Sequence, residues 1–341
     1  MKNKIIAFDP LSVKYNNENE EVVFISVKRE ISNILNSYVG WYDPFCELIQ
    51  NALDAVDKRR ELNDKFLPTI HILIDLKNNK ISVTDNGIGF KEAEYFKFLA
   101  PNFSFKSGGN TRGHKGVGTT YLAYGFNYIQ VATKTPDFFA VGVMKGAKHW
   151  LEDPAPSANP RVVPDTEEVD DRFFYDIDRG TSMTIKCDSE SYPKDLSWMG
   201  LTTATNWLNV LRVQTGLGQI QSSGDVSIAV EVLDKKGKLT SDSIDNPQYL
   251  LISEFIDKAK RVDDIKRKMD ELYKKSGPNY KMPAKFSNLE AVYDSWDCQK
   301  LLEEVKFDLT QQEDIKKNNI KVIFRLCILW PYGIKLIIWL E

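Results

Sequence analysis

The spacing of hydrophobic residues changes along the first half of the chain between the period of a helix and the alternation of a strand. Apolar residues over about 22–37 recur with the helical period, which predicts a first helix. A second helix is expected from Asp43 to about Arg60, because Pro44 suits a first helical turn. Apolar runs over 70–76 and 80–84, separated by a Lys-Asn-Asn turn, predict two neighbouring strands.

The pattern then continues with shorter elements. Helices are predicted over 91–99 and 117–124, and strands are predicted over 128–133, 138–144 and 181–187. These elements do not follow the strand–helix–strand order of a dinucleotide-binding unit.

The second half of the chain has a different character. A helix is predicted over 196–211 and a strand over 226–233. Over 252–273 apolar residues occupy one helical face and charges of both signs the other, which predicts a long amphipathic helix. We interpret its polar face as solvated, and a helix that binds a partner is the alternative.

The C-terminal segment 322–340 is almost wholly apolar. Its apolar run is interrupted by Arg325, Pro331, Gly333 and Lys335, whereas a membrane-spanning helix needs about 20 apolar residues with few charges. The segment is therefore expected to form a buried strand pair rather than a membrane anchor.

Length and composition are those of a soluble globular protein. The 341 residues are enough for two domains, and 42% hydrophobic and 27% charged residues are ordinary values. We expect a first domain over 1–190 and a second over 191–341, complete or truncated, with a helical insertion at about 250–276. The net charge of −3 excludes a global basic field, so nucleic-acid binding would need a local patch.

Cysteine and histidine usage does not indicate a metal centre. The four cysteines are far apart and form no Cys-x-x-Cys pair, so zinc is not expected and a reducing cytoplasm fits best. The three histidines are too scattered for a histidine metal site. The N-terminal residues contain no apolar run of the length found in a signal peptide.

The segment ELIQNALDA at 47–55 offers two polar groups on one face of the second predicted helix. Glu47 and Asn51 are four residues apart, so their side chains point to the same side. The Asn51 amide oxygen suits one ligand position of magnesium, which takes oxygen ligands together with waters and phosphates. Glu47 could deprotonate a water, an effect typically worth about 10²–10⁴ in rate. Such pairs are also common on exposed helices, so this pair alone does not establish a site.

The segment DNGIGF at 85–90 places an acid in a glycine turn. Gly87 and Gly89 free the backbone for unusual torsion angles and for the close approach of a ligand. The Asp85 carboxylate can accept a hydrogen bond from an exocyclic amine such as that of adenine. An ordinary turn at the end of a strand has the same pattern, so this signal is also weak by itself.

The segment GHKGVG at 113–118 is a glycine-rich loop before a predicted helix. Backbone N–H groups of such a loop, with the N-terminus of the helix, form a site for phosphates. Lys115 adds a positive charge, and a structural role is favoured for His114. The loop lacks the Gly-Lys-Ser/Thr of a Walker A motif, and no strand directly precedes it as in a Rossmann fingerprint.

The fixed order of the three segments, followed by Gly180–Thr181 at the start of a later strand, resembles the GHKL ATP-binding superfamily. Its members include gyrase B, the ninety-kilodalton heat-shock chaperones, MutL, MORC proteins and histidine kinases. The resemblance covers about 22–188. It implies an α+β Bergerat fold, a two-layer sandwich with a mixed β-sheet and helices on one face, followed by a transducer-like or middle-like domain.

The resemblance also implies that ATP and Mg²⁺ bind at this site. Glu47 would activate water, Asn51 would bind the metal, and Asp85 would bind adenine with support from Thr181. Residues 92–112 would form a lid over ATP. The further ATP-binding residues that it implies are Gly87, Gly89, Lys106, Gly113, Lys115, Gly116, Val117 and Gly118.

Within this superfamily the sequence favours hydrolysis over transfer of phosphate to a histidine. No histidine precedes Glu47, although a histidine kinase needs its phosphoacceptor before the ATP site. Glu47 stands where a general base belongs. The second domain of hydrolysing members usually supplies a polar group to the γ-phosphate, and Lys235, Lys236 and Lys238 are candidates.

The resemblance further implies that ATP closes the lid and brings two copies together as a homodimer, with residues 1–28 as a candidate exchanged arm. The favoured function is a cytoplasmic ATPase that drives a DNA-associated or prokaryotic antiviral defence process. The alternative is a chaperone-like or scaffold module whose ATP binding gates a protein partner. DNA is a candidate partner that the net charge does not indicate, and a membrane is not favoured.

Overall fold

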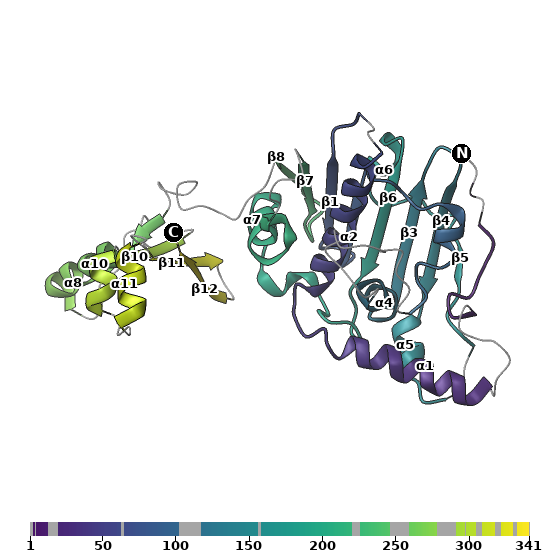
Figure 1. Ribbon diagram of the computed structural model, residues 1–341, viewed down its shortest axis with the longest axis horizontal. Coiled ribbons are helices and arrows are strands. Elements are labelled where there is room, and N and C mark those ends of the chain that lie inside the picture. Colours follow the sequence, from purple (N-terminus) through teal and green to yellow (C-terminus); the bar gives the residue numbers. More distant parts are fainter. Residues whose placement is uncertain are drawn as a thin grey trace. The chain divides into compact units, whose positions relative to one another are not determined.

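The chain divides into two compact units, each of which contains a β-sheet and helices (Figure 1). The first unit is Met1–Ser197 with Leu201–Tyr249, and the second is Trp198–Gly200 with Leu250–Glu341. The computed structural model describes residues 3, 5–12, 20–62, 65–101, 117–155, 158–219, 226–245, 259–277, 291–296, 298–304, 309–317, 322–329 and 333–340.

The first unit is built on a mixed sheet of eight strands. Every neighbouring pair of these strands is antiparallel except β1 and β7, which are parallel. In sheet order the strands are β5 (Val162–Pro164), β4 (Phe139–Lys145), β3 (Tyr128–Lys134), β6 (Gly180–Lys186), β2 (Lys80–Asp85), β1 (Thr69–Asp75), β7 (Ser227–Leu233) and β8 (Leu239–Asp245).

Strand β7 pairs with β1, so the boundary between the two units does not lie between residues 190 and 191, where the sequence predicts it. Residues of β7 lie directly beside those of β1, from Thr69 opposite Ser227 to Asp75 opposite Leu233. The chain between residues 201 and 249 therefore completes the first unit instead of beginning the second.

Helices α2, α4 and α7 lie on the same side of this sheet (Figure 1). Helix α2 packs on β1, β2 and β6, helix α4 on β3, and helix α7 on β7 and β8. The helices of the first unit are α1 (Glu20–Leu35), α2 (Asp43–Arg60), α3 (Glu92–Tyr95), α4 (Val117–Tyr124), α5 (Ala147–Glu152), α6 (Phe173–Asp176) and α7 (Ala204–Gln214), with the 3₁₀ turn η3 (Gly216–Gln219). The 3₁₀ turn η2 (Leu196–Met199) begins in this unit and ends in the second.

The core between α2 and the sheet is formed by residues that are buried with the helical repeat in α2 and by alternation in β1. Every second residue of β1 is fully buried, namely Ile70, Ile72 and Ile74. The buried residues of α2 recur with the helical period and face these strands. Phe45 of α2 also packs against Trp207 of α7, with ring centroids 5.3 Å apart. This packing fixes the rotation of α2 against the sheet. The position of the helix face that carries Glu47 and Asn51 is thereby fixed as well.

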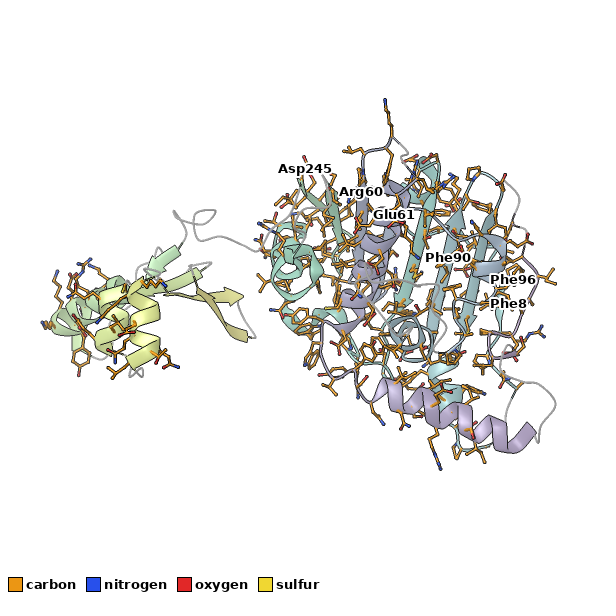
Figure 2. All side chains as sticks on the ribbon, viewed as in Figure 1. Phe8, Arg60, Glu61, Phe90, Phe96 and Asp245 are labelled. Atoms are coloured by element: carbon orange, nitrogen blue, oxygen red, sulfur yellow. The ribbon has the colours of Figure 1, made fainter. Side chains whose placement is uncertain are left out.

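The described residues near the N-terminus pack against the same unit. Phe8 exchanges two backbone hydrogen bonds of 3.0 Å with Val162 of the edge strand β5. Its ring meets that of Phe96 at 4.8 Å between centroids (Figure 2). In α1, the Lys28 ammonium donates to the carbonyl oxygens of Trp150 and Asp153. An exchanged dimer arm formed by residues 1–28 stays a prediction.

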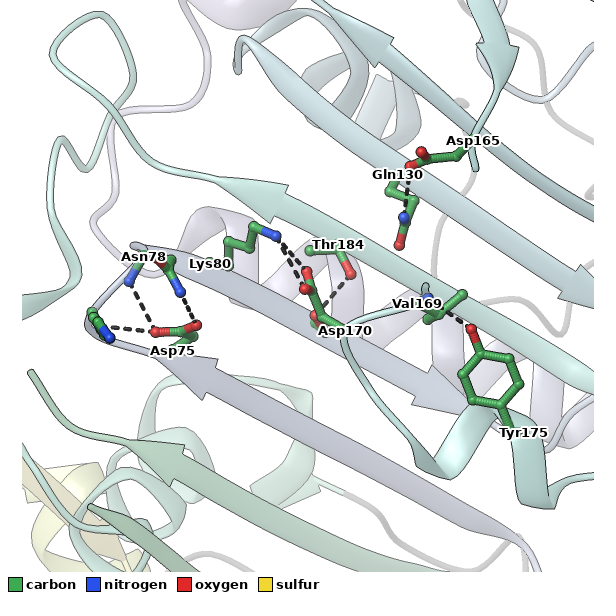
Figure 3. Close-up of polar contacts among 11 residues, drawn as sticks. Asp75, Asn78, Lys80, Gln130, Asp165, Val169, Asp170, Tyr175 and Thr184 are labelled. Atoms are coloured by element: carbon green, nitrogen blue, oxygen red, sulfur yellow. Dashed lines mark hydrogen bonds and ion pairs between the residues drawn. The ribbon is translucent and has the colours of Figure 1, made fainter. Parts of the chain in front are cut away.

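The other face of the sheet is covered by residues 165–177, and polar side chains make much of this contact (Figure 3). Lys80 of β2 donates to Asp170 at 2.8 Å, and Gln130 of β3 donates to Asp165 at 2.7 Å. The Tyr175 hydroxyl accepts the backbone N–H of Val169 at 2.9 Å.

Two expected helices of the second half differ from those observed. The helix predicted over 196–211 is divided into η2 and α7, because Gly200 between them has a left-handed φ of 68°. The helix predicted over 252–273 is wrong at Ala259–Arg261, because these residues form β9, which pairs with β10. Helix α8 follows at Val262–Ser276, and residues 250–258 lie outside the described chain.

The second unit contains the strand pair expected near the C-terminus. Strands β11 and β12 are antiparallel, with Val322 opposite Leu340 and Leu329 opposite Gly333. No helix in the described ranges is long and apolar enough to cross a membrane. The strands, in sheet order, are β12 (Gly333–Leu340), β11 (Val322–Leu329), β10 (Ala291–Trp296) and β9 (Ala259–Arg261), and the other helices are α10 (Cys298–Glu304) and α11 (Leu309–Lys317).

Candidate functional site

A cavity of about 430 Å³ lies in the first unit, lined by α2, the ends of β2 and β6, and the start of α4. The structure brings most of the predicted site residues that it describes to this cavity. These residues are Glu47, Asn51, Asp85, Gly89, Val117, Gly118 and Thr181.

The remaining predicted residues are accounted for separately. Gly87 lies just behind the cavity wall, against the backbone of Ala55, where a side chain would collide. The predicted phosphate-binding residues Lys106, Gly113, Lys115 and Gly116 lie outside the described residues, as do residues 102–112 of the predicted lid.

Helix α2 supplies one wall of the cavity along its length. Glu47 and Asn51 both line it, as their spacing predicts, and Ala55 continues the same face. The Ile88 N–H donates to the Ala55 carbonyl oxygen at 3.0 Å, which anchors the loop after β2 to the helix. Ala55 follows Glu47 by eight residues, about 12 Å along the helix axis. Glu47 and the Asp85 loop therefore mark two separated ends of one elongated site.

Asp85 occupies the end of the cavity that is formed by the sheet. Its side chain is buried, and its backbone lies opposite Thr181 in the β2–β6 register. Burial raises the pKa of Asp85 to about 7. Hydrogen bonds from the backbone N–H groups of Gly87 and Thr181 favour the charged form and lower the pKa, but burial has the larger effect. A carboxyl group with this pKa is divided between its protonated and charged forms near neutral pH.

Gly180 allows the close approach of β6 to Asp85. Its φ of 149° is a conformation that favours glycine, and a Cβ there would collide with the Asp85 carbonyl oxygen. The Gly-Thr pair that the sequence singled out thus places Thr181 directly beside the acid.

The Asn51 amide has unused hydrogen-bonding capacity at the cavity. Its Nδ2 atom is buried and has no hydrogen-bond partner within the described parts of the chain. The oxygen and nitrogen of an asparagine amide are assigned from their neighbours and can exchange places. A buried polar atom without a partner costs about 1–3 kcal/mol, so this group suits a polar ligand.

Glu47 is held at the opposite end of the cavity from Asp85. The Tyr38 hydroxyl donates to its Oε1 atom at 2.9 Å. Gly118 of α4 lies against the other side of the carboxylate, where a Cβ would collide with Oε2. The acid is thereby fixed between the turn before α2 and the first turn of α4.

The cavity also has an apolar wall between its two polar ends. Val83 and Met183 face it from neighbouring positions of β2 and β6, and Ile88 and Phe98 line it from the following loop and α3 region. Apolar walls with a few directed polar groups are typical of sites for small molecules. This wall suits a flat apolar ring whose edge meets Asp85.

Several residues at the site are absent from the sequence prediction. Lys58 lines the cavity and follows Glu47 by eleven residues, about three helical turns, so its spacing could have revealed it. Arg179 also lines the cavity, directly before Gly180–Thr181. Tyr38 has no spacing signal, because it reaches Glu47 from outside the helix.

Arg59 braces the same region without facing the cavity. Its buried guanidinium donates to both carboxylate oxygens of Asp178, at 2.9 and 3.0 Å, and to the Asn86 carbonyl oxygen at 2.9 Å. The last turn of α2 is thereby tied to the loop after β2 and to the chain before β6, the two segments that flank Asp85.

The described residues contain no group of three or more His, Cys, Asp and Glu side chains arranged for a metal ion. A magnesium ion beside Asn51 would take most of its ligands from phosphates and water, as this ion commonly does. No protein-family model matches the sequence, and no curated protein matches it either.

Proposed function

We propose that this chain binds ATP with magnesium in the cavity of the first unit and hydrolyses it to ADP and phosphate. The observation that supports this proposal best is the meeting of Glu47, Asn51, Asp85 and Gly118 in one cavity, although they come from separate sequence segments. The mixed sheet with α2, α4 and α7 on one side supports assignment to the Bergerat fold.

Adenine would bind at the sheet end of the cavity. The Asp85 carboxylate would accept a hydrogen bond from the exocyclic amine, and Ile88 and Met183 would contact the ring. The phosphates would extend along α2 toward Glu47. Asn51 would offer an amide oxygen to magnesium, which would neutralise charge on the phosphates.

Glu47 would act as the general base at the phosphate end. It would take a proton from a water molecule whose oxygen attacks the γ-phosphorus, while the bond to the β-phosphate oxygen breaks and ADP leaves. The position of Glu47 between Tyr38 and Gly118 would hold it toward one water. Such positioning supplies most of the catalysis that a protein offers in phosphoryl transfer.

The proposal is tested by phosphate release and ATP binding in matched variants. Wild type should release phosphate when magnesium and ATP are present, and Glu47→Gln should bind ATP but lose about 10²–10⁴ in rate. Glu167→Gln is the control, because Glu167 is an exposed acid on the segment covering the other face of the sheet. Equal rates in wild type and Glu47→Gln would contradict the role of the base.

The same measurements separate the two kinds of function that the sequence leaves open. Turnover by wild type supports an ATPase, and stimulation of that turnover by added DNA would support a DNA-associated or defence process. The proposed process takes place in the cytoplasm, and it uses an ATP-dependent dimer, as the family resemblance implies. ATP binding without turnover would support the alternative of a chaperone-like or scaffold module whose bound nucleotide gates a protein partner.

A further inference from the structure

Tyr38 makes a directed contact with the proposed general base. It lies in the turn between α1 and α2 and donates a hydrogen bond from its hydroxyl to Oε1 of Glu47 at 2.9 Å. Tyr38 precedes Glu47 by nine residues and is not part of α2. The contact therefore depends on the tertiary structure and not on the helical repeat.

The ring of Tyr38 is itself held by α4. It stacks on Tyr121 with 4.0 Å between ring centroids and an angle of 6° between the planes. Tyr121 is buried, and its hydroxyl donates to the Tyr192 carbonyl oxygen at 3.2 Å. The same helix supplies Gly118, which lies against the Glu47 carboxylate. Helix α4 thus supports Glu47 both directly and through the ring of Tyr38.

The phenol of Tyr38 remains a hydrogen-bond donor at physiological pH. Burial, and then the charge of Glu47 and the hydrogen bond to it, raise the pKa of Tyr38 far above its ordinary value. A hydroxyl that donates to a carboxylate favours the ionised form of that acid. Ionised Glu47 is the form that can accept a proton from water.

We propose that Tyr38 is a positioning residue for the reaction, which fixes the Glu47 carboxylate and keeps it ionised through one hydrogen bond. This inference rests on the proposed ATP hydrolysis and adds a residue to it. Tyr38 does not line the cavity in the described part of the chain, so it acts through Glu47 and not on the nucleotide.

The variant Tyr38→Phe tests the inference, because it keeps the stacked ring and removes only the hydroxyl. At pH 7 its kcat should fall roughly 10-fold while its affinity for ATP stays within about two-fold of wild type. The acidic limb of the kcat profile should move to higher pH, because Glu47 loses a donor that favours its charge. Tyr175→Phe is the matched control, since its hydroxyl contacts Val169 on the other face of the sheet.

A second readout does not require turnover. The Glu47 carboxyl signal can be followed by ¹³C nuclear magnetic resonance, assigned by its loss in Glu47→Gln, and its midpoint should rise by roughly one pH unit in Tyr38→Phe. An unchanged midpoint and an unchanged kcat, in an enzyme whose wild type is active, would overturn this inference alone. Absence of phosphate release by wild type would overturn the proposed function and this inference with it.

Discussion

The buried carboxyl group of Asp85 should make the stability of the first unit depend on pH, and Asp85→Asn should remove this dependence. Burial raises its pKa to about 7 in the folded chain, against an ordinary value of 3.8. Between these two values the folded state binds more protons than the unfolded state. The free energy of unfolding therefore falls as the pH rises through this window, and the full loss is reached above about pH 7.

The size of the effect follows from the two pKa values. The difference between 3.8 and about 7, at about 1.36 kcal/mol per pH unit, corresponds to on the order of 4 kcal/mol. Asparagine cannot ionise, and its amide oxygen can still accept the Gly87 N–H. Its NH₂ group would face the Thr181 N–H, a mismatch that costs about 1–3 kcal/mol at every pH. Relative to wild type, the variant should thus gain stability as the pH rises.

Urea unfolding followed by tryptophan fluorescence, at intervals from pH 5 to pH 8, measures this difference. The second unit is identical in both proteins, so its contribution is common to the two series. The free energy of unfolding of the variant minus that of wild type should increase steadily with pH. A difference that stays constant within about 0.5 kcal/mol would show that Asp85 does not titrate in this range.

Two other substitutions have defined outcomes. Burial alone would lower the pKa of His71, but the 2.8 Å hydrogen bond to Asp171 and nearby negative charge outweigh burial and raise this pKa. The stabilising contribution of His71 is therefore complete below about pH 6.5, and it is lost as the pH rises through the pKa of the folded state. His71→Gln should therefore destabilise the chain by about 1–2 kcal/mol at pH 6 and by less at pH 9, and equal losses in urea unfolding at both would refute this. Gly118→Ala should lower phosphate release roughly 10-fold, because its Cβ would displace the Glu47 carboxylate. Gly216→Ala, where a Cβ meets only ordinary contact at 3.7 Å, is its control, and equal rates in the two variants would count against the displacement.

The sequence predicted two parts of the site, one from the spacing of residues on a helix and one from the resemblance to a known family. Glu47 and Asn51 share a face because they lie four residues apart on a helix whose buried face the sequence pattern defines. Asp85 and Thr181 come from different strands, and only the resemblance to a known family linked them before the β2–β6 register placed them side by side.

The parts that the sequence did not predict depend on contacts between distant segments. Tyr38 reaches Glu47 because its ring stacks on Tyr121, more than eighty residues later, and no periodic pattern encodes such a stack. The strand β8 was missed because Leu239–Asp245 consists mainly of Ser, Thr and Asp residues and lies at an edge of the sheet, with little apolar alternation.

The parallel pairing of β1 with β7 has a consequence for the synthesis of this protein. Strand β1 ends at Asp75, and its partner is complete only at Leu233. At about 5–20 residues per second, translation leaves one edge of β1 without its partner for roughly 8–30 s. This edge belongs to a strand with three isoleucines, a composition prone to intermolecular β-pairing. We therefore expect this edge of β1 to be open to pairing with another chain until β7 leaves the ribosome.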